Sequence, residues 1–451
     1  MKLLLFIILY FFVSSFIFSS DQEIINNAIG IGDCETLYNF VQNPEGKDPR
    51  LVSTANQALR RYTTLDTAAS RYRTNRMNER VRNLGRELTE NVFLDPQRYL
   101  PDVVTRLVAG ISDPFMKVKV INDWICDNIA YDVDHYFGRT YNRQDYVSVI
   151  RNKKGVCSGY AAVFNAMCRL ASIESIGISG FSKGVGYRGY LGTSSDHEWN
   201  AVKISNKWYL IDVTWNAGYL IYRSFIKKYT TDYLFLDSRA FLYSHLPVES
   251  KYQFYAPVVT REQFTDEPYI AGIFFRYGLE LKDELPRYNN LTDNGFTFEL
   301  TMRNTSVTLS SQLRTKQRQN VTGASRPARS GNTTRFTFNV PDTGDFIGHV
   351  FARLGAERRI HEYIPVYTFE HSIIPTLDTL LENRRITARE KELFLTSYYK
   401  VEAEEHYYFL EDQFDTPRNN AVIKIHPLVN LRLDMMDAVL TFNLSRMPDN
   451  P

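Results

Sequence analysis

The sequence predicts an α+β protein with a helical N-terminal part, a mixed middle part and a β-rich C-terminal part. Apolar residues three and four positions apart run from residue 21 to about residue 91, which is typical of amphipathic helices. A helical stretch followed by short alternating runs occupies residues 155–215. From about residue 255 onward, short alternating runs separated by turn residues dominate. These three parts together indicate the α+β class.

The composition is that of a globular protein with several cores. The chain has 451 residues, of which 44% are hydrophobic and 14% aromatic, with only 23 Gly and 17 Pro. These figures exclude a collagen-like, coiled-coil or wholly disordered chain. At roughly 150 residues per domain, the length predicts about three domains. The formal net charge of +2 provides no overall field for gathering nucleic acid, so we expect no nucleic-acid partner.

The first 20 residues form a separate segment. Lys2 precedes an apolar run that ends at Phe18, and the polar residues Ser19, Ser20 and Asp21 follow. The run is shorter than the about 20 residues that a membrane-spanning helix needs, and its pattern is typical of a secretory signal peptide. We therefore expect residues 1–20 to be a signal peptide and the mature chain to be secreted or extracellular. The alternative is a retained segment that anchors the chain to a membrane.

The mixed middle part follows an α-helical extension over residues 21–95 and occupies residues 96–254. Two helices are predicted within residues 100–130, and a loop within residues 132–142. After Gly155, one face of the next helix is apolar and carries Tyr160, Phe164, Met167, Cys168 and Ala171. Strands are predicted over residues 176–181, 199–204 and 208–215. Three tryptophans flank the last two strands and are expected to pack in the core: Trp199, Trp208 and Trp215.

The C-terminal part reads as β structure in two segments, residues 255–370 and 371–451. In the first segment, strands are predicted over residues 269–277, 296–302, 305–309, 334–340, 347–353 and 363–369. Their spacing predicts a β-sandwich of immunoglobulin-like type. Residues 311–333 are polar and rich in arginine, so we expect a long exposed loop there, with a polyanion site as the alternative. The second segment is β-rich and unassigned to a known module.

Cys157 stands at the predicted start of the helix that follows Gly155. The free N–H groups and the dipole at a helix N-terminus stabilise negative charge, which favours the thiolate, the nucleophilic form of a cysteine. Gly155 and Gly159 are expected to leave the sulfur open to a substrate. A cysteine in this position is more often a small buried residue, so Cys157 by itself does not indicate catalysis.

His197 and Asp212 lie on two predicted strands joined by a short turn. If that turn has two residues, Ile204 faces Lys207, His197 faces Thr214, and Asp212 is the diagonal neighbour of His197 on the same face. An odd-length loop would place the two side chains on opposite faces of the hairpin. The two-residue turn therefore predicts an imidazole next to a carboxylate.

Together, Cys157, His197 and Asp212 predict a catalytic triad of the cysteine type. In that scheme, Cys157 attacks a carboxamide or peptide carbonyl, His197 moves the proton to the leaving amine, and Asp212 fixes the imidazole tautomer. Water or a primary amine then resolves the thioester. The backbone N–H of Cys157 is one expected donor to the oxyanion, and Gln144 is a candidate for the second.

The order and context of these residues resemble the transglutaminase-like superfamily, and within it the branch of the kyphoscoliosis peptidase. The resemblance rests on residues 155–171 (GVCSGYAAVFNAMCRLA), 196–204 (DHEWNAVKI) and 207–218 (KWYLIDVTWNAG), with supporting blocks at residues 120–132, 232–236 and 243–247. It implies a papain-like α+β core within residues 96–254, protein substrates, and catalytic roles for Cys157, His197 and Asp212. That branch also carries β-sandwich modules after its core.

Two features depart from the branch. Glu198 stands where the branch usually has a small residue, and a carboxylate there could bias His197 or narrow the space for substrate. The N-terminal helices and the secretory signal are unlike the muscle-associated members, so no cytoskeletal role is inferred. The sequence thus predicts a cysteine-dependent acyltransferase or peptidase that acts on glutamine side chains or peptide bonds. The alternative is a catalytically weak or inactive scaffold that binds other proteins.

The sequence indicates no cofactor and no metal ligand set. Calcium dependence stays open, because no EF-hand loop is present and scattered acidic residues do not define a site. The four cysteines are few for a secreted protein and include no C-x-x-C pair, so neither a zinc knuckle nor a disulfide scaffold fits. Cys168 is assigned to the core, and only Cys34 and Cys126 could form a disulfide. Glycan acceptor motifs occur at Asn290, Asn304, Asn320, Asn332 and Asn443.

Overall fold

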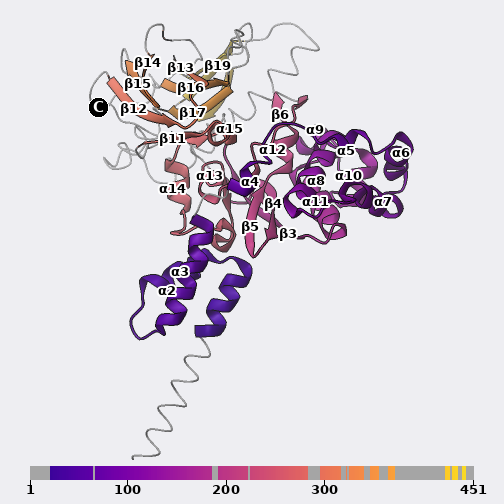
Figure 1. Ribbon diagram of the computed structural model, residues 1–451. Coiled ribbons are helices and arrows are strands. Elements are labelled where there is room, and N and C mark those ends of the chain that lie inside the picture. The colour runs from indigo at the N-terminus through magenta and orange to yellow at the C-terminus, as the bar shows by residue number, and fades with distance from the viewer. Residues whose placement is uncertain are drawn as a thin grey trace, which may run out of the picture. The chain divides into compact units, whose positions relative to one another are not determined.

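The computed structural model divides into two compact units, whose helices and strands are labelled in Figure 1. Unit 1 contains residues up to 182 together with 192–219 and 225–264, and unit 2 contains residues 183–191, 220–224 and 265–451. The structure describes residues 21–63, 67–184, 191–221, 224–282, 295–315, 321, 325–339, 346–354, 364–370, 422–426, 429–434 and 439–442. The predicted signal peptide lies outside these residues. No helix in the described part of the chain combines the length and apolar character that a membrane crossing requires.

Helices make up most of residues 21–95, as predicted. Residues 21–31 are helical, and they are followed by α2 (Cys34–Gln42), α3 (Pro49–Thr63), α4 (Thr67–Ser70), α5 (Glu79–Arg82) and α6 (Arg86–Leu94). Asp33 caps α2 by accepting a hydrogen bond from the N–H of Thr36 at 3.1 Å. Residues of the second half of this stretch belong to the hydrophobic core of unit 1: Ala69, Tyr72, Val81, Leu84 and Val92. The extension and the core therefore share apolar packing.

The two helices predicted within residues 100–130 are confirmed as α7 (Pro96–Val108) and α8 (Pro114–Asn128). Each begins with a proline after a capping aspartate, which is favourable because the first helical N–H has no intrahelical acceptor. The loop predicted over residues 132–142 is wrong at its start, where α9 (Val133–Tyr136) follows. Asp132 starts this helix by accepting from the N–H of His135 at 3.2 Å, and four residues are too few to show helical periodicity.

Unit 1 is built around a five-stranded sheet with the strand order β8-β5-β4-β3-β9. Its strands are β3 (Glu174–Ser182), β4 (His197–Ile204), β5 (Lys207–Ile211), β8 (Leu234–Leu236) and β9 (His245–Pro247), and neighbouring strands are antiparallel. Helix α11 (Cys157–Leu170) packs on β3 and β4, together with α8 and α10 (Tyr146–Asn152) on the same side of the sheet (Figure 1). The predicted apolar face of α11 is buried, including Phe164 and Cys168.

The strand predicted over residues 208–215 ends early. Strand β5 stops at Ile211, and α12 (Val213–Ala217) follows, because the Asp212 side chain accepts from the N–H of Trp215 at 2.9 Å and caps a helix there. The predicted pairing of Ile204 with Lys207 is present, whereas the expected pairing of His197 with Thr214 is not. The alternating apolar pattern could not distinguish a strand from a helix here, since Val213 would be buried in either.

Shorter elements complete unit 1 and the connections to unit 2. They are β1 (Ala130–Tyr131), β2 (Lys154–Gly155), β6 (Gly218–Ile221), β7 (Ser224–Lys227), α13 (Ser238–Phe241), η1 (Ser250–Gln253) and α14 (Arg261–Asp266). Strands β1 and β2 pair in parallel just before α11. This pairing fixes the loop that leads into Cys157.

Unit 2 contains two four-stranded sheets, with strand orders β10-β17-β16-β13 and β11-β12-β15-β14. Its elements are β10 (Tyr269–Ile270), α15 (Gly272–Arg276), β11 (Leu279–Leu281), β12 (Gly295–Met302), β13 (Val307–Thr315), β14 (Ser325–Ser330), β15 (Thr333–Asn339), β16 (Phe346–Leu354) and β17 (Ile364–Glu370). The strand pairs are antiparallel, as in an immunoglobulin-like sandwich. A separate sheet joins β18 (Val422–His426), β19 (Val429–Asp434) and β20 (Val439–Phe442).

Two predictions for this unit are wrong. The strand expected over residues 269–277 is the short β10 followed by helix α15. The loop expected over residues 311–333 contains the end of β13 and all of β14, which is an edge strand. Edge strands commonly carry charged side chains and proline, as β14 does with Arg326, Pro327 and Arg329, so polarity did not distinguish strand from loop.

Two of the five predicted glycan acceptors lie within the residues that the structure describes. Asn304 and Asn332 are exposed in unit 2, whereas Asn290, Asn320 and Asn443 lie outside the described residues. Glycosylation and secretion stay predictions.

Gly32 anchors the first helices to the sheet of unit 1. Its φ is +76°, and a β-carbon at this position would lie 2.6 Å from both Trp208 Cδ1 and Tyr62 Oη. Tyr62 in turn stacks on Phe254, at 6.2 Å between ring centroids. Only a glycine allows this close approach without displacing Trp208 and Tyr62.

We expect Gly32→Ala to lower the free energy of unfolding by roughly 2–4 kcal/mol, because it combines a disfavoured backbone conformation with overpacking. Urea unfolding of the two proteins would measure the difference. Gly30→Ala is the matched control, since a β-carbon there meets nothing within 4 Å. An equal loss in the control would show that contact with Trp208 is not the cause.

Candidate active site

Cys157 is the first residue of α11 and is half-buried. The first N–H groups of a helix have no acceptor within the helix, and here they lie at the end of α11 that carries Cys157. The N-cap residue, Val156, has no side-chain hydrogen bond to them. Gln144 Oε1 accepts from the N–H of Val156 at 2.9 Å, and Gln144 Nε2 donates to the carbonyl of Asn142 at 2.9 Å. Gln144 therefore holds the loop before Cys157, and its role as an oxyanion donor stays a prediction.

The glycines that flank Cys157 are required by packing. A β-carbon at Gly159 would lie 2.4 Å from Gln144 Oε1 and 2.8 Å from Val149 Cγ2, and one at Gly155 would lie 2.9 Å from Val149 Cγ1. The sequence analysis assigned these glycines to substrate access. In the structure they let Gln144 and Val149 approach the backbone that carries Cys157.

His197 and Asp212 form a buried pair, as predicted. His197 begins β4, Asp212 follows β5, and the two-residue turn between these strands brings His197 Nε2 to 2.7 Å from Asp212 Oδ2. Asp212 Oδ1 accepts from the N–H of Trp215, so the carboxylate also caps α12. The cap fixes the carboxylate in the orientation that receives the imidazole.

The charges of this pair stabilise each other. Burial opposes protonation of the imidazole, but the charge and hydrogen bond of Asp212 outweigh burial and, with a further contribution from Cys157, raise the pKa of His197 to about 10. Burial would likewise raise the pKa of Asp212, yet His197 and His245 hold the pKa of this carboxyl well below its usual range. Both shifts favour an imidazolium paired with a carboxylate.

The thiol completes the arrangement. Cys157 acts on His197 as well, since its side chain and its charge both help to raise the pKa of the imidazole. Because Nε2 of this ring faces Asp212, the nitrogen left for Cys157 is Nδ1. Tyr131 and the exposed Tyr136, whose rings are 5.6 Å apart, both interact electrostatically with Cys157. Of the three side chains predicted from the sequence, His197 and Asp212 are in direct contact, and the half-buried Cys157 influences the charge of the imidazole.

The structure adds His245, which the sequence analysis did not identify as a site residue. This histidine is fully buried, and its Nε2 lies 3.0 Å from the same Asp212 Oδ2 that contacts His197. Burial is the main reason that its pKa is lowered to about 4, with Asp212 opposing the shift. His245 lies 33 residues after Asp212, and only the pairing of β9 with β3 brings it close. One indication of His245 was present in the sequence: it lies in the block at residues 243–247 that supports the resemblance to the transglutaminase-like superfamily.

His197, Asp212 and His245 also include the ligand types that bind transition metals. One atom from each lies within 4.8 Å of the others. A tetrahedral ion at about 2.0 Å from each donor would hold the donors about 3.3 Å apart. The two Nε2 to Oδ2 distances are 2.7 and 3.0 Å, which are those of direct hydrogen bonds. The arrangement fits a shared carboxylate better than a metal site.

Glu198 lies away from the imidazole. Alternation along β4 places its side chain on the opposite face of the strand from His197, near Gly177 and Asn165, with its Oε1 2.9 Å from the β-carbon position of Gly177. Burial raises the pKa of Glu198, and His197 acts on it only through charge. The carboxylate therefore does not replace Asp212 as a partner of the histidine.

The tryptophans divide between packing and the site. Trp199 and Trp208 are buried, as expected for core residues. Trp215 is half-buried, and its ring lies 5.6 Å from that of His197 and 4.5 Å from that of His245. Trp215 thus covers the imidazole pair.

All four cysteines lie in the described residues, and all are free. The disulfide considered between Cys34 and Cys126 is therefore absent. Cys126 donates to the carbonyl of Val213 at 3.6 Å. Cys34 is buried at the start of α2. Burial raises the pKa of both thiols, which keeps them protonated. Cys168 is buried in the core, as predicted.

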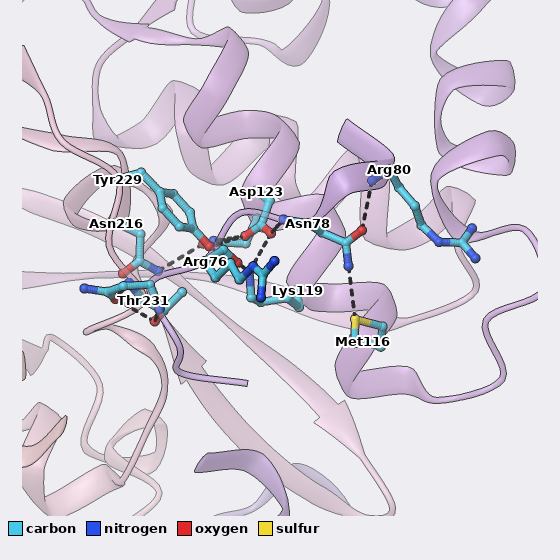
Figure 2. A network of polar contacts seen from close by, with 11 residues as sticks. Arg76, Asn78, Arg80, Met116, Lys119, Asp123, Asn216, Tyr229 and Thr231 are labelled. Atoms are coloured by element: carbon cyan, nitrogen blue, oxygen red, sulfur yellow. Dashed lines mark hydrogen bonds and ion pairs between the residues drawn. The ribbon is translucent and has the colours of Figure 1, made fainter. Parts of the chain in front are cut away.

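A network of polar contacts includes Asn216 of α12 and Lys119 and Asp123 of α8 (Figure 2). Asn216 of α12 donates through Nδ2 to Asn122 Oδ1 at 3.0 Å and accepts at Oδ1 from the N–H of Tyr233 at 3.0 Å. Asn122 is next to Asp123 on α8 and donates to Asp123 Oδ1 at 3.3 Å. The helix capped by Asp212 is thus tied to α8 by side-chain hydrogen bonds.

The network centres on an ion pair within α8. Lys119 Nζ lies 2.5 Å from Asp123 Oδ2, and it also donates to Tyr229 Oη at 2.7 Å and to the carbonyl of Arg76 at 2.9 Å. Tyr229 donates to Asp123 Oδ1 at 2.6 Å (Figure 2). All three donors of the buried ammonium therefore have acceptors, which is what makes a buried charge tolerable.

Comparison with known proteins gives two matching domains. The Transglutaminase-like superfamily matches residues 101–213, a range that contains the cysteine, histidine and aspartate described above. The KY-like, immunoglobulin-like domain matches residues 261–370. The second range covers the two four-stranded sheets of unit 2. The α+β fold with an immunoglobulin-like C-terminal region is thereby confirmed.

Several animal proteins are similar to part of the chain. Kyphoscoliosis peptidase from Homo sapiens is 31% identical over 186 residues, which are 40% of this chain and 28% of that protein. Hillarin from Drosophila melanogaster is 26% identical over 43% of this chain and 25% of its own length. The Lim and transglutaminase domain protein ltd-1 from Caenorhabditis elegans is 24% identical over 45% of this chain and 30% of its own length. The aligned part spans less than a third of each relative.

The buried ion pair should be costly to break. We expect Lys119→Met to lower the free energy of unfolding by about 3–5 kcal/mol, because it leaves the Asp123 carboxylate buried without its cation. Urea unfolding would measure the loss. Arg86→Met is the matched control, since Arg86 and Glu90 form a helical pair with the same spacing on the surface, worth at most about 1 kcal/mol. Similar losses in both variants would contradict this account.

His245 should make stability depend on pH. Its pKa is lowered in the folded state, so between about pH 4 and pH 6.5 the unfolded chain binds more protons and stability rises with pH. His197 has a raised pKa, so its contribution is full below pH 6.5 and is lost as the pH rises toward 10. Between pH 4 and 6.5, the free energy of unfolding of wild type should rise by on the order of 3 kcal/mol more than that of His245→Gln. Urea unfolding at several pH values would measure both. An unchanged slope would show that His245 does not titrate in this window.

Proposed function

Because the chain carries a transglutaminase-like domain and a KY-like immunoglobulin-like domain, we propose that its core performs thiol-mediated acyl transfer on protein substrates. In this proposal Cys157 is the nucleophile, His197 is the acid and base, and Asp212 orients the imidazole. The observation that carries it is the buried hydrogen bond between His197 and Asp212, together with a half-buried thiol at the start of α11 that helps to raise the pKa of this imidazole. That combination is the one acyl transfer by a cysteine requires.

The first half of the reaction forms a thioester. The Cys157 thiolate attacks the carbonyl carbon of a glutamine carboxamide or a peptide bond, and the carbonyl oxygen takes the negative charge. In this proposal the backbone N–H of Cys157, at the start of α11, donates to that oxyanion. His197 then gives its proton to the leaving nitrogen as the carbon–nitrogen bond breaks, which releases ammonia or an amine.

The second half consumes the thioester. Neutral His197 takes a proton from water or from a primary amine as that group attacks the thioester carbon, and the sulfur leaves as the thiolate. Water gives deamidation or hydrolysis, and an amine gives transamidation. Asp212 stabilises the imidazolium in both halves, which agrees with the raised pKa of His197. The acceptor and the bond that enters the site decide between these outcomes.

The proposal is tested by following a glutamine-rich protein incubated with the chain and a tagged primary amine, with and without calcium. Mass spectrometry should show amine incorporation or deamidation that disappears in Cys157→Ala, whereas cleavage that depends on Cys157 would define a peptidase. If neither product forms, the result favours the second candidate, a scaffold that binds proteins through the immunoglobulin-like domain. That outcome would contradict the enzymatic proposal.

Alkylation by iodoacetamide tests the thiol without a substrate. Cys157 should react selectively, since the other three cysteines are buried. An unassisted thiol ionises near pH 8.5, so His197→Ala should slow alkylation at pH 6 by about tenfold or more. Cys157→Ala identifies the modified residue. An equal rate in wild type and His197→Ala would show that the imidazole does not activate the sulfur.

A further inference from the structure

A second imidazole shares the carboxylate of the proposed triad. His245 Nε2 and His197 Nε2 both lie within hydrogen-bond distance of Asp212 Oδ2, at 3.0 and 2.7 Å. Asp212 Oδ1 accepts from the N–H of Trp215 at 2.9 Å. The buried carboxylate therefore has three donors, and His245 is a side-chain donor that the acyl-transfer scheme does not use.

The neighbours of His245 select its tautomer. Ser244 Oγ lies 2.8 Å from Nδ1 of the ring and 3.3 Å from the carbonyl of Phe241. A hydroxyl has one hydrogen, and the shorter contact assigns that hydrogen to Nδ1. The ring hydrogen is then on Nε2, where it points at Asp212. A ring kept neutral by burial can fill both roles without adding a second positive charge beside His197.

Aromatic packing prevents His245 from turning away. Its ring centroid lies 4.2 Å from that of Phe241 and 4.5 Å from that of Trp215. Trp199 and Tyr233 close the remaining sides, at 5.1 and 5.4 Å. Strand β9 holds the backbone of His245 against Ser182 of β3. The N–H at Nε2 is therefore a fixed point against which the Asp212 carboxylate is placed.

We propose that His245 is a positioning residue that holds Asp212 Oδ2 in line with Nε2 of His197 and so keeps His197 aligned with Cys157. The proposal rests on the acyl-transfer function given above. His245 acts through Asp212, so its removal should lower kcat and leave KM unchanged. A misplaced catalytic group commonly costs roughly 10- to 100-fold in rate.

Two amide variants isolate the hydrogen bond to Asp212. The amide nitrogen of His245→Gln reaches the position of Nε2, whereas that of His245→Asn reaches only the position of Nδ1. Both variants are uncharged and similar in polarity. We expect kcat within about threefold of wild type for His245→Gln and a 10- to 100-fold lower kcat for His245→Asn, with equal KM. Alkylation of Cys157 at pH 6 should fall in the same order.

Ser244→Ala provides a second variant if His245→Asn does not fold, as judged by circular dichroism. Without the hydroxyl, Nδ1 loses the hydrogen bond from Ser244, so the ring keeps only one of the two hydrogen bonds that orient its Nε2–H toward Asp212. We expect about a threefold or larger loss of kcat, again without a change in KM. Equal kcat values for the folded Gln and Asn variants, or wild-type kcat in folded Ser244→Ala, would overturn the positioning role.

The outcomes separate this inference from the proposed function. If His197→Ala alkylates like wild type and no acyl transfer is found, the acyl-transfer proposal itself fails. If wild type is active and His197→Ala alkylates slowly, but both amide variants at position 245 match wild type, only the positioning role fails. A change in KM alone would also overturn it, because a substrate contact would then explain the effect.

Discussion

The buried carboxylate of Asp212 is the constraint on which the rest of unit 1 depends. A carboxylate with no solvent exposure is stable only if donors surround it, and here two imidazoles and one backbone N–H do so. Those donors come from β4, from β9 and from α12. The hydrogen bonds to the Asp212 carboxylate therefore hold three elements in place relative to one another: the β4–β5 hairpin, the edge strand β9 and the helix α12.

A second buried carboxylate stabilises the same region from α8. Asp123 is paired with Lys119 and hydrogen-bonded by Tyr229, and its neighbour Asn122 connects to Asn216 of α12. Each buried group in this network has a partner, so α12 is held at both ends of its short length. A five-residue helix has little stability of its own, which explains why its position is set by side-chain hydrogen bonds.

The position of Cys157 depends on close packing of the backbone around it. Gln144 and Val149 occupy the space that side chains at positions 155 and 159 would need. The thiol stays partly exposed at the end of α11, while the groups that orient His197 are buried behind it. The thiol is therefore partly accessible from solvent, whereas the hydrogen bonds between His197 and Asp212 and between His245 and Asp212 are buried.

The α+β class and the helix that begins at Cys157 could be predicted from the amino-acid pattern, and the contact between His197 and Asp212 could be predicted on the condition that the turn between their strands has two residues. These features rest on local spacing, which periodicity and turn length report directly. Three features could be seen only in the folded chain: α12 replaces the end of a strand, β14 is an edge strand, and His245 lies beside Asp212. Each of these depends on a partner distant in the chain or on a single capping side chain, and local hydrophobic patterns carry no record of either.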